Sequence, residues 1–202
     1  MTLAATLQFN EADHAYYLDG RRLPSVTQII GEVIPRNFYA SEWHLNRGSM
    51  LHEAIHLHLQ GVLDPDSVDP IIQPRLDAAT KFIEECNVTV TECEKRVASA
   101  GLGFAGTVDC IAQIGKDVCL VDWKSTLEPQ ADLQLGGYAL LLKDHNITKA
   151  VAVELRDNGS YSCRWLKQGQ LKLASQTFLA LLTIYGWMTA NNIQGRNQDG
   201  NN

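Results

Sequence analysis

The stretch GTVDCIAQIGKDVCLVDWKST, residues 106–126, decides how this chain folds. It contains two apolar runs joined by Gly115-Lys116, and a glycine at the first central position favours a two-residue type II′ hairpin turn. With that turn as the reference for strand register, Asp109 lies opposite Asp122. Lys124 follows Asp122 by two residues and returns to the same strand face. We therefore expect a hairpin that brings two carboxylates and an amine together.

This group of charges needs a physical reason. Like charges directly opposite each other in a hairpin are destabilising. A diagonal salt bridge between Asp109 and Lys124 on a solvated face is the simpler alternative. However, residues 118–123 are almost continuously apolar, as in a strand covered on both faces, where charged groups are rarely left unpaired. The sequence therefore predicts a divalent cation held by the carboxylates.

The composition limits the classes of protein to which the chain can belong. Its 202 residues, 45% of them hydrophobic, suffice for one good core. No apolar run reaches membrane-spanning length and the N-terminus lacks a signal pattern, so we expect a cytoplasmic protein without membrane contact. Five cysteines without a C-x-x-C pair argue against a zinc ribbon or an iron–sulfur cluster. The net charge of −6 argues against a large basic surface for binding DNA phosphates, although bound cations would neutralise part of the negative charge.

The apolar periodicity predicts alternating helices and strands. Expected elements are an N-terminal hairpin over 6–19 with a turn at 20–22, helices over 26–34, 39–59, 69–87, 130–146 and 169–191, and strands over 88–97, 150–155 and 161–166 besides the central hairpin. Their order predicts an α/β fold with a mixed sheet. We expect one domain over residues 1–193 and a flexible polar tail over residues 194–202.

An ordered set of motifs surrounds the hairpin. Its members are Glu94, Gly106-Thr107-Val108-Asp109, Asp122-Trp123-Lys124, and Gln134 with Tyr138 one helical turn apart. This set resembles the RecB-like branch of the PD-(D/E)xK nucleases. Two upstream stretches are similar to the branch's helical histidine motif and to the opening of its phage-type and mitochondrial-type exonucleases, respectively: Arg47-Gly48-Ser49-Met50-Leu51-His52 and Pro24-Ser25-Val26-Thr27.

The resemblance implies a fold and a function. The implied fold is a three-layer restriction-endonuclease-like core, with a mixed central β-sheet flanked by helices, an N-terminal hairpin and a helical extension. The implied function is a Mg²⁺- or Mn²⁺-dependent DNA exonuclease that processes DNA ends in recombination, repair or replication. A bacteriophage or prophage origin and a single-strand-annealing or single-strand-binding partner protein are further expectations. Strand preference, polarity, exonuclease or endonuclease action, and oligomeric state stay open.

The resemblance also implies residue roles. Asp109, Asp122 and the backbone carbonyl of Trp123 would hold one or two metal ions, with Glu94 as the third carboxylate. Lys124 would orient or deprotonate the attacking water and offset charge in the transition state. Glu92, two residues before Glu94 on the same strand face, stays open as an alternative ligand.

Residues on two helices would complete the site. His52 would bind or border a second metal ion. Gln134 and Tyr138 share a helix face and would contact the DNA backbone or steer Lys124. Arg47 and Ser125 are weaker candidates for phosphate contacts. The neighbouring glycines 136 and 137 destabilise a helix by about 1 kcal/mol each, which a close approach of backbone or ligand would explain.

Three other functions compete with this interpretation. His52-Glu53-Ala54-Ile55-His56 spells the H-E-x-x-H signature of zinc peptidases, which leaves the hairpin carboxylates unexplained. A non-catalytic DNA-binding module on the same fold would be expected to lose an acidic ligand or the lysine, and this chain retains them. Endonucleases of CRISPR adaptation have a similar architecture but hold an iron–sulfur cluster, for which the late cysteines here do not suffice.

Overall fold

A computed structural model describes residues 5–34 and 42–193. Its centre is a sheet in the order β4-β5-β6-β7-β8, in which β6 and β7 are parallel and the other neighbours antiparallel. The strands are β4 (Val88–Ser99), β5 (Phe104–Ile114), β6 (Asp117–Lys124), β7 (Lys149–Leu155) and β8 (Tyr161–Lys167). The mixed central sheet predicted from the sequence is therefore confirmed.

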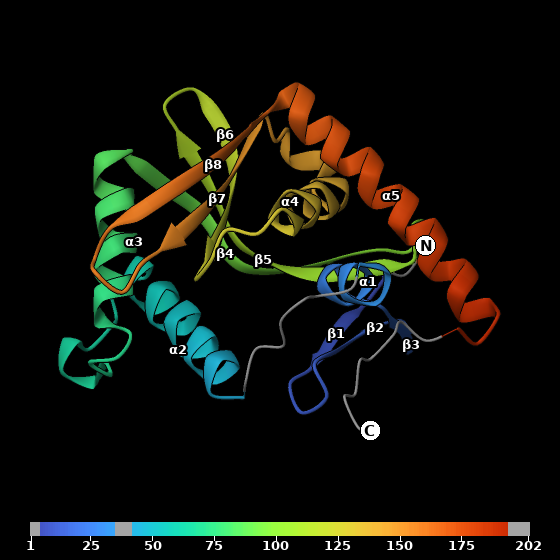
Figure 1. The fold of residues 1–202 in the computed structure, drawn as a ribbon, viewed down its shortest axis with the longest axis horizontal. Helices are drawn as coiled ribbons and strands as arrows, with labels where there is room; N and C mark the ends of the chain where they lie inside the picture. Colours follow the sequence, from blue (N-terminus) through green and yellow to red (C-terminus); the bar gives the residue numbers. More distant parts are fainter. Residues whose placement is uncertain (1–4, 35–41, 194–202) are drawn as a thin grey trace, which may run out of the picture.

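Helices cover both faces of this sheet (Figure 1). One face carries α1 (Val26–Val33), α4 (Gln130–Leu141) and α5 (Gln168–Ala190), and the other carries α2 (Glu42–Leu59) and α3 (Gln73–Glu85). Two short 3₁₀ turns, η1 (Pro65–Ser67) and η2 (Lys143–His145), follow α2 and α4. Each face buries its own hydrophobic cluster, so the architecture has the three layers that were expected, a mixed sheet between two layers of helices.

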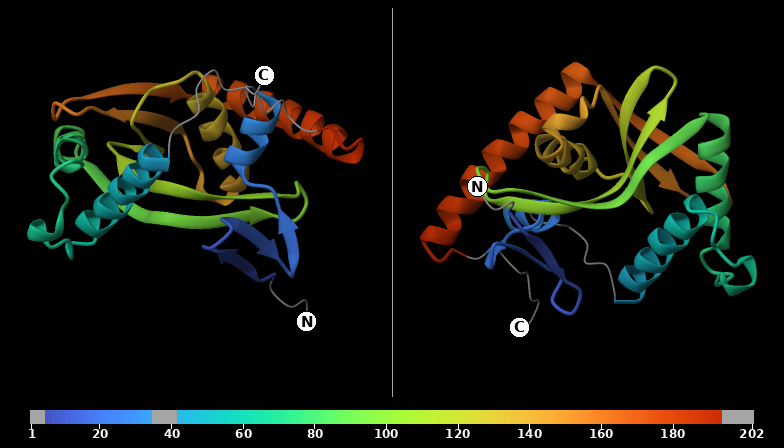
Figure 2. Two further views of the ribbon diagram at one scale, coloured as in Figure 1. Left: turned by 60° about the horizontal axis from the view of Figure 1, so that its bottom comes forward. Right: turned by 180° about the vertical axis from the view of Figure 1, so that it is seen from behind.

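The N-terminal segment forms a small antiparallel sheet rather than a hairpin. Strands β1 (Leu7–Asn10) and β2 (Ala15–Leu18) were expected, but β3 (Arg21–Leu23) occupies the segment predicted as a turn. The chain reverses one step earlier, where Asp19 and Gly20 both take a positive φ. This sheet lies beside the end of β4 and the start of β5 (Figure 2). There the Ala105 amide donates to the Pro24 carbonyl.

The central hairpin has the predicted register. Ile114 pairs with Asp117 and Ala112 with Cys119, and Gly115 has the positive φ of +61° that the first central position of the turn requires. The ladder ends at Cys110–Val121, one step before the expected pair of aspartates. Beyond that step the strands are joined through a side chain, because the Trp123 amide donates to Asp109.

Most helix boundaries agree with the periodicity. Ser25 caps α1, the helix predicted over 26–34, by accepting from the Gln28 amide. Helix α3 begins later than expected because Asp69 forms a local turn, accepting from the Ile71 amide, and α4 ends before Asn146. No helix in the described ranges is both long and apolar enough to cross a membrane. The predicted helical start at 39–41 and the predicted polar tail lie outside the described residues.

The glycine pair in α4 is explained by helix packing. A Cβ atom on Gly136 would lie 2.4 Å from the backbone carbon of Ala174 in α5, and one on Gly137 would lie 3.0 Å from Phe178. Ser175 also donates to the Gly136 carbonyl. Close packing against the α5 backbone at Gly136, and against the Phe178 and Val26 side chains at Gly137, therefore explains these two glycines without a ligand.

Candidate active site

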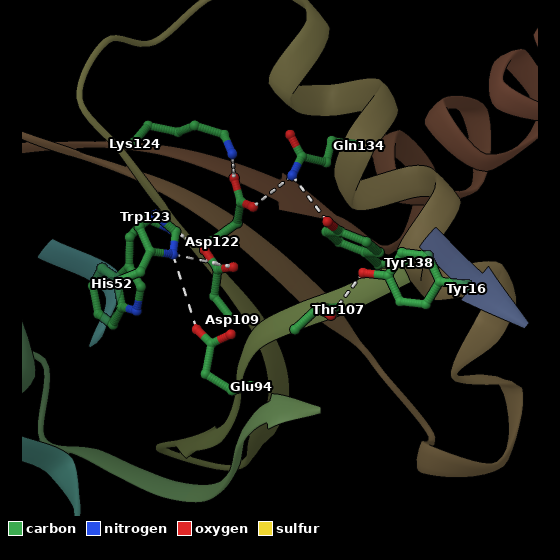
Figure 3. Close-up of polar contacts among 10 residues, drawn as sticks. All are labelled: Tyr16, His52, Glu94, Thr107, Asp109, Asp122, Trp123, Lys124, Gln134 and Tyr138. Carbon is green, nitrogen blue, oxygen red and sulfur yellow. Dashed lines mark hydrogen bonds and ion pairs between the residues drawn. The ribbon is translucent and has the colours of Figure 1, made fainter. Parts of the chain in front are cut away.

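Asp109 lies at the centre of the candidate site. It extends from β5, is 8% exposed, and its Oδ2 accepts from the Trp123 amide at 2.9 Å. Its Oδ1 lies 3.5 Å from Nδ1 of His52, which comes from α2 (Figure 3). The contact to His52 joins a helix to the hairpin, and the sequence could propose it only through the resemblance.

Glu94 reaches the same place through an unusual backbone conformation. It interrupts the β4–β5 pairing between Cys93–Cys110 and Lys95–Val108, and its φ of +47° is uncommon for a residue with a side chain. Such conformations are strained and cluster at functional sites. Its Oε1 lies 4.0 Å from His52 Nδ1, and one ligand atom each from His52, Glu94 and Asp109 lie within 4.8 Å of one another.

Glu92 has different neighbours. A β-bulge between Val90 and Glu92 shifts the strand register, and Glu92 contacts Lys95 and, at 3.1 Å, Nε2 of His145 beyond α4. The structure does not bring Glu92 into the His52–Asp109 group. The alternation argument that put Glu92 and Glu94 on one face fails because Glu94 itself takes a left-handed backbone conformation, with a φ of +47°.

A second set of contacts surrounds Asp122. This residue is 1% exposed, and its Oδ2 lies 2.6 Å from Lys124 Nζ. Its Oδ1 accepts from Gln134 Nε2 at 3.2 Å, and the same nitrogen lies 3.1 Å from the Tyr138 hydroxyl, to which it donates (Figure 3). In this conformation Asp122 is turned toward Lys124 and α4, so it is not part of the group formed by His52, Glu94 and Asp109.

Two further residues lie beside Tyr138, and sequence reasoning missed one of them (Figure 3). Gly106 leaves room for the ring, since a Cβ there would lie 2.7 Å from Tyr138 Cε1. Tyr16 of β2 reaches the same neighbourhood, and its hydroxyl lies 2.7 Å from Thr107 Oγ1 (Figure 3). The Gly-x-x-Asp spacing pointed to the Gly106 position, but nothing local in the sequence marked Tyr16.

The pKa values of the charged residues in the site are strongly shifted. Burial and the neighbouring Asp109 raise the pKa of Glu94 to about 7. Burial and Asp109 also raise the pKa of Asp122 to about 6, although Lys124 opposes this shift. Burial would lower the pKa of His52, but the Asp109 carboxylate outweighs it and raises the value to about 9. Burial disfavours the ionised form of Asp109, but His52 and Lys124 hold its pKa below the usual range.

These residues suit a hard divalent cation. Two carboxylates and an imidazole converge, and oxygen and imidazole ligands are those that Mg²⁺ and Mn²⁺ accept. The raised carboxyl pKa values show negative charge brought together in a buried place, and a cation would relieve this repulsion. The metal-ligand assignments themselves remain predictions.

The other predicted residues lie near this group in different ways. Arg47 lies over the Trp43 ring at 4.6 Å and 4.0 Å from Asp157, so a protein carboxylate already partners it. Ser125 directly follows β6 and is exposed. The Trp123 ring packs on Phe82 in the core, and the role of its carbonyl stays a prediction.

The H-E-x-x-H motif does not form a site of its own. Whereas His52 faces Glu94 and Asp109, His56 Nε2 lies 3.0 Å from the Gln60 side chain. In the described residues, His56 takes no part in the group formed by His52, Glu94 and Asp109. The zinc peptidase interpretation therefore has no support from the geometry.

The fold and the site agree with what the sequence resemblance implied. A mixed sheet lies between helical layers, with Asp109 on one strand and Asp-x-Lys ending the next, as expected from the resemblance to the PD-(D/E)xK nucleases. No protein-family model matches the chain.

Particular relatives are exonucleases. The chain is 23% identical over 134 residues to mitochondrial genome maintenance exonuclease 1 of Mus musculus, a match that covers 56% of this chain and 40% of the relative. The chain thus spans less than half the length of that relative. Among solved structures it is similar to the alkaline exonuclease LHK-Exo of Laribacter hongkongensis, with 15% identity, 83% and 92% of the two chains covered, and a TM-score of 0.41. A complex of LHK-Exo with dAMP gives 16% identity, 84% and 93% coverage, and a TM-score of 0.42.

Proposed function

We propose that this chain is a metal-dependent deoxyribonuclease that hydrolyses phosphodiester bonds at DNA ends. The observation that carries the proposal is the position of Asp109. It lies between His52 of α2 and Glu94 of β4 on one side and the Asp122–Lys124 ion pair of β6 on the other. A metal site beside a positioned amine in a buried setting suits hydrolysis of an anionic ester.

Each residue then has a chemical role. Asp109, Glu94 and His52 would hold the cation, joined by Asp122 and the Trp123 carbonyl if Asp122 turns away from Lys124. A bound Mg²⁺ or Mn²⁺ would supply positive charge that stabilises the developing charge on the phosphate. Lys124 would orient the attacking water, accept its proton or offset charge on the phosphoryl oxygens.

Residues of α4 would position Lys124 and the DNA backbone. Gln134 donates to Asp122, the partner of Lys124, so that it fixes one carboxylate oxygen and leaves the other for the amine. Tyr138 is anchored by the same amide and packs over Gly106. Arg47 and Ser125 are proposed phosphate contacts, with Arg47 exchanging Asp157 for a phosphate.

The decisive experiment uses end-labelled linear DNA and closed circular DNA. We expect the purified chain to degrade linear DNA in Mg²⁺ or Mn²⁺, to stop on addition of EDTA, and to leave circles intact. Cleavage of circles would instead assign an endonuclease of the same fold, and intact linear DNA after prolonged incubation with either metal would refute the proposal. Action in recombination, repair or replication beside a single-strand-binding or annealing protein is part of the same proposal, as is a phage or prophage origin.

A further inference from the structure

Two cysteines lie directly beside two of the site carboxylates. Cys93 precedes Glu94 on β4, Cys110 follows Asp109 on β5, and the two cysteines are direct partners in the β4–β5 register. Both are free thiols, and each contributes to the pKa shift of the other. The reaction proposed above uses neither of them.

This placement fits a disulfide. Directly opposite residues of an antiparallel pair have Cα atoms about 4.5 or 5.5 Å apart, depending on the pair type. Disulfides span Cα separations of about 4.4–6.8 Å. Both pair types therefore allow a bond without a change of strand register. Cys93 is half-buried, so an oxidant in solution can reach it, whereas Cys110 is fully buried behind it.

We propose that Cys93 and Cys110 form a reversible disulfide across β4 and β5, and that this bond weakens cation binding by Glu94 and Asp109. The oxidant is a low-molecular-weight disulfide such as oxidised glutathione. The Cys93 sulfur attacks it, forming a mixed disulfide and releasing one glutathione. The Cys110 sulfur then attacks the Cys93 sulfur and releases the second. Two protein thiols are oxidised, one glutathione disulfide is reduced to two thiols, and the cysteine protons leave with the glutathiones.

The effect on the cation site follows from the distances involved. The S–S bond is about 2.05 Å long, so the two sulfurs must move together from non-bonded contact. Their backbone neighbours carry the carboxylates, and Glu94 already has a φ of +47°. Disturbing the groups that orient metal ligands lowers metal affinity by about 10-fold to 100-fold, and we expect a loss in that range.

Peptide mapping tests the bond itself. The native chain is incubated with oxidised glutathione, its free thiols are blocked, and it is digested with trypsin plus a glutamate-specific protease. Cleavage after Glu92 separates Cys86 from Cys93, and cleavage after Lys95, Arg96 and Lys116 leaves Cys110 on its own peptide. We expect a linked pair containing Cys93 and Cys110 that is lost on reduction. Unlinked Cys93 and Cys110 under these conditions would overturn the proposal.

Metal titration tests the consequence. Binding of Mn²⁺ is measured by calorimetry for the reduced chain, the oxidised chain, and the oxidised chain after re-reduction. Weaker binding that recovers on reduction supports the proposal, and equal affinity of the linked and reduced forms refutes it. Cys93→Ala should make the affinity insensitive to the oxidant, whereas Cys163→Ala, on β8, should not. The weakening of the cation site rests on the proposed function, because it assumes the proposed metal centre. Formation of the linked peptide does not depend on that function. Failure of the reduced chain to cleave DNA would therefore count against the proposed function alone.

Discussion

The two halves of the site differ in how completely their polar groups are partnered. Around Lys124, both oxygens of Asp122 face protein donors, the lysine at 2.6 Å and Gln134 at 3.2 Å. Around His52, the contacts are longer, 3.5 Å to Asp109 and 4.0 Å to Glu94, and Glu94 carries a strained backbone. The difference shows that protein groups alone partner Asp122 in the Lys124 half. The longer contacts in the His52 half are consistent with the cation that we propose there.

Replacing Asp109 should break both halves at once, and this is the largest effect we expect. Asp109→Asn keeps the shape but removes the charge that joins His52 to the hairpin. Cleavage should fall below detection and calorimetric Mn²⁺ binding should be lost, with the circular dichroism spectrum unchanged. Substantial residual cleavage would contradict the central position given to Asp109.

Replacing Lys124 should slow cleavage without weakening metal binding, so that the roles of the two halves can be told apart. Lys124→Met removes the amine but retains much of the side-chain volume, and the loss of a general acid–base group lowers rates by about 10²–10⁴-fold. Binding of Mn²⁺ at the His52 half should survive. Steady-state cleavage rates and calorimetry distinguish this outcome from loss of the metal, which would mean that the halves are not independent.

The two glutamates of β4 provide a matched comparison. Glu94→Gln should weaken Mn²⁺ affinity and slow cleavage, because Glu94 lies beside His52. Glu92→Gln should leave both nearly unchanged, because Glu92 contacts Lys95 and His145 instead. The opposite ranking would assign the third carboxylate to Glu92.

A glycine substitution tests the packing on the Lys124 side. In Gly106→Ala the new Cβ would meet the buried Tyr138 ring at 2.7 Å, so we expect a loss of about 1–3 kcal/mol in unfolding free energy, as for other overpacked cores. Displacement of Tyr138 should also slow cleavage. The control is Gly101→Ala, where an added Cβ meets no atom within 4 Å. Equal denaturant midpoints for the two variants would rule out this close contact.

The smallest expected effect is the pH dependence of the metal-free chain. The raised pKa values of Glu94, about 7, and Asp122, about 6, favour the protonated folded state, so this stability is present in acid and is lost as the pH rises through these values. The pKa of His52 is raised to about 9, so the stability that its protonated form contributes is likewise lost as the pH rises, at higher pH values. The melting temperature should therefore fall from about pH 5 to about pH 9, and saturating Mg²⁺ should reduce the fall. A metal-free melting temperature that rises over this range would contradict these protonation states.

The sequence predicted the central hairpin because its determinants are local. A glycine in the turn and alternating apolar residues fix the register, so the pairs Ile114–Asp117 and Ala112–Cys119 were predictable. Helix α1 was predictable for the same reason, since Ser25 caps its own helix. The resemblance to nucleases added Glu94, His52 and Gln134 to the predicted site. Local sequence patterns alone do not connect these residues to the hairpin.

What only the tertiary structure decided concerns groups that are distant along the chain. The left-handed backbone at Glu94 and the bulge before Glu92 send the two glutamates to different partners, which strand alternation cannot foresee. The contact between Tyr16 and Thr107 joins residues 91 positions apart, and the glycines of α4 are explained only by the packing of that helix against α5 and α1. Local propensity specifies turns, caps and strand register. The neighbours of a side chain across layers depend on how the whole chain packs.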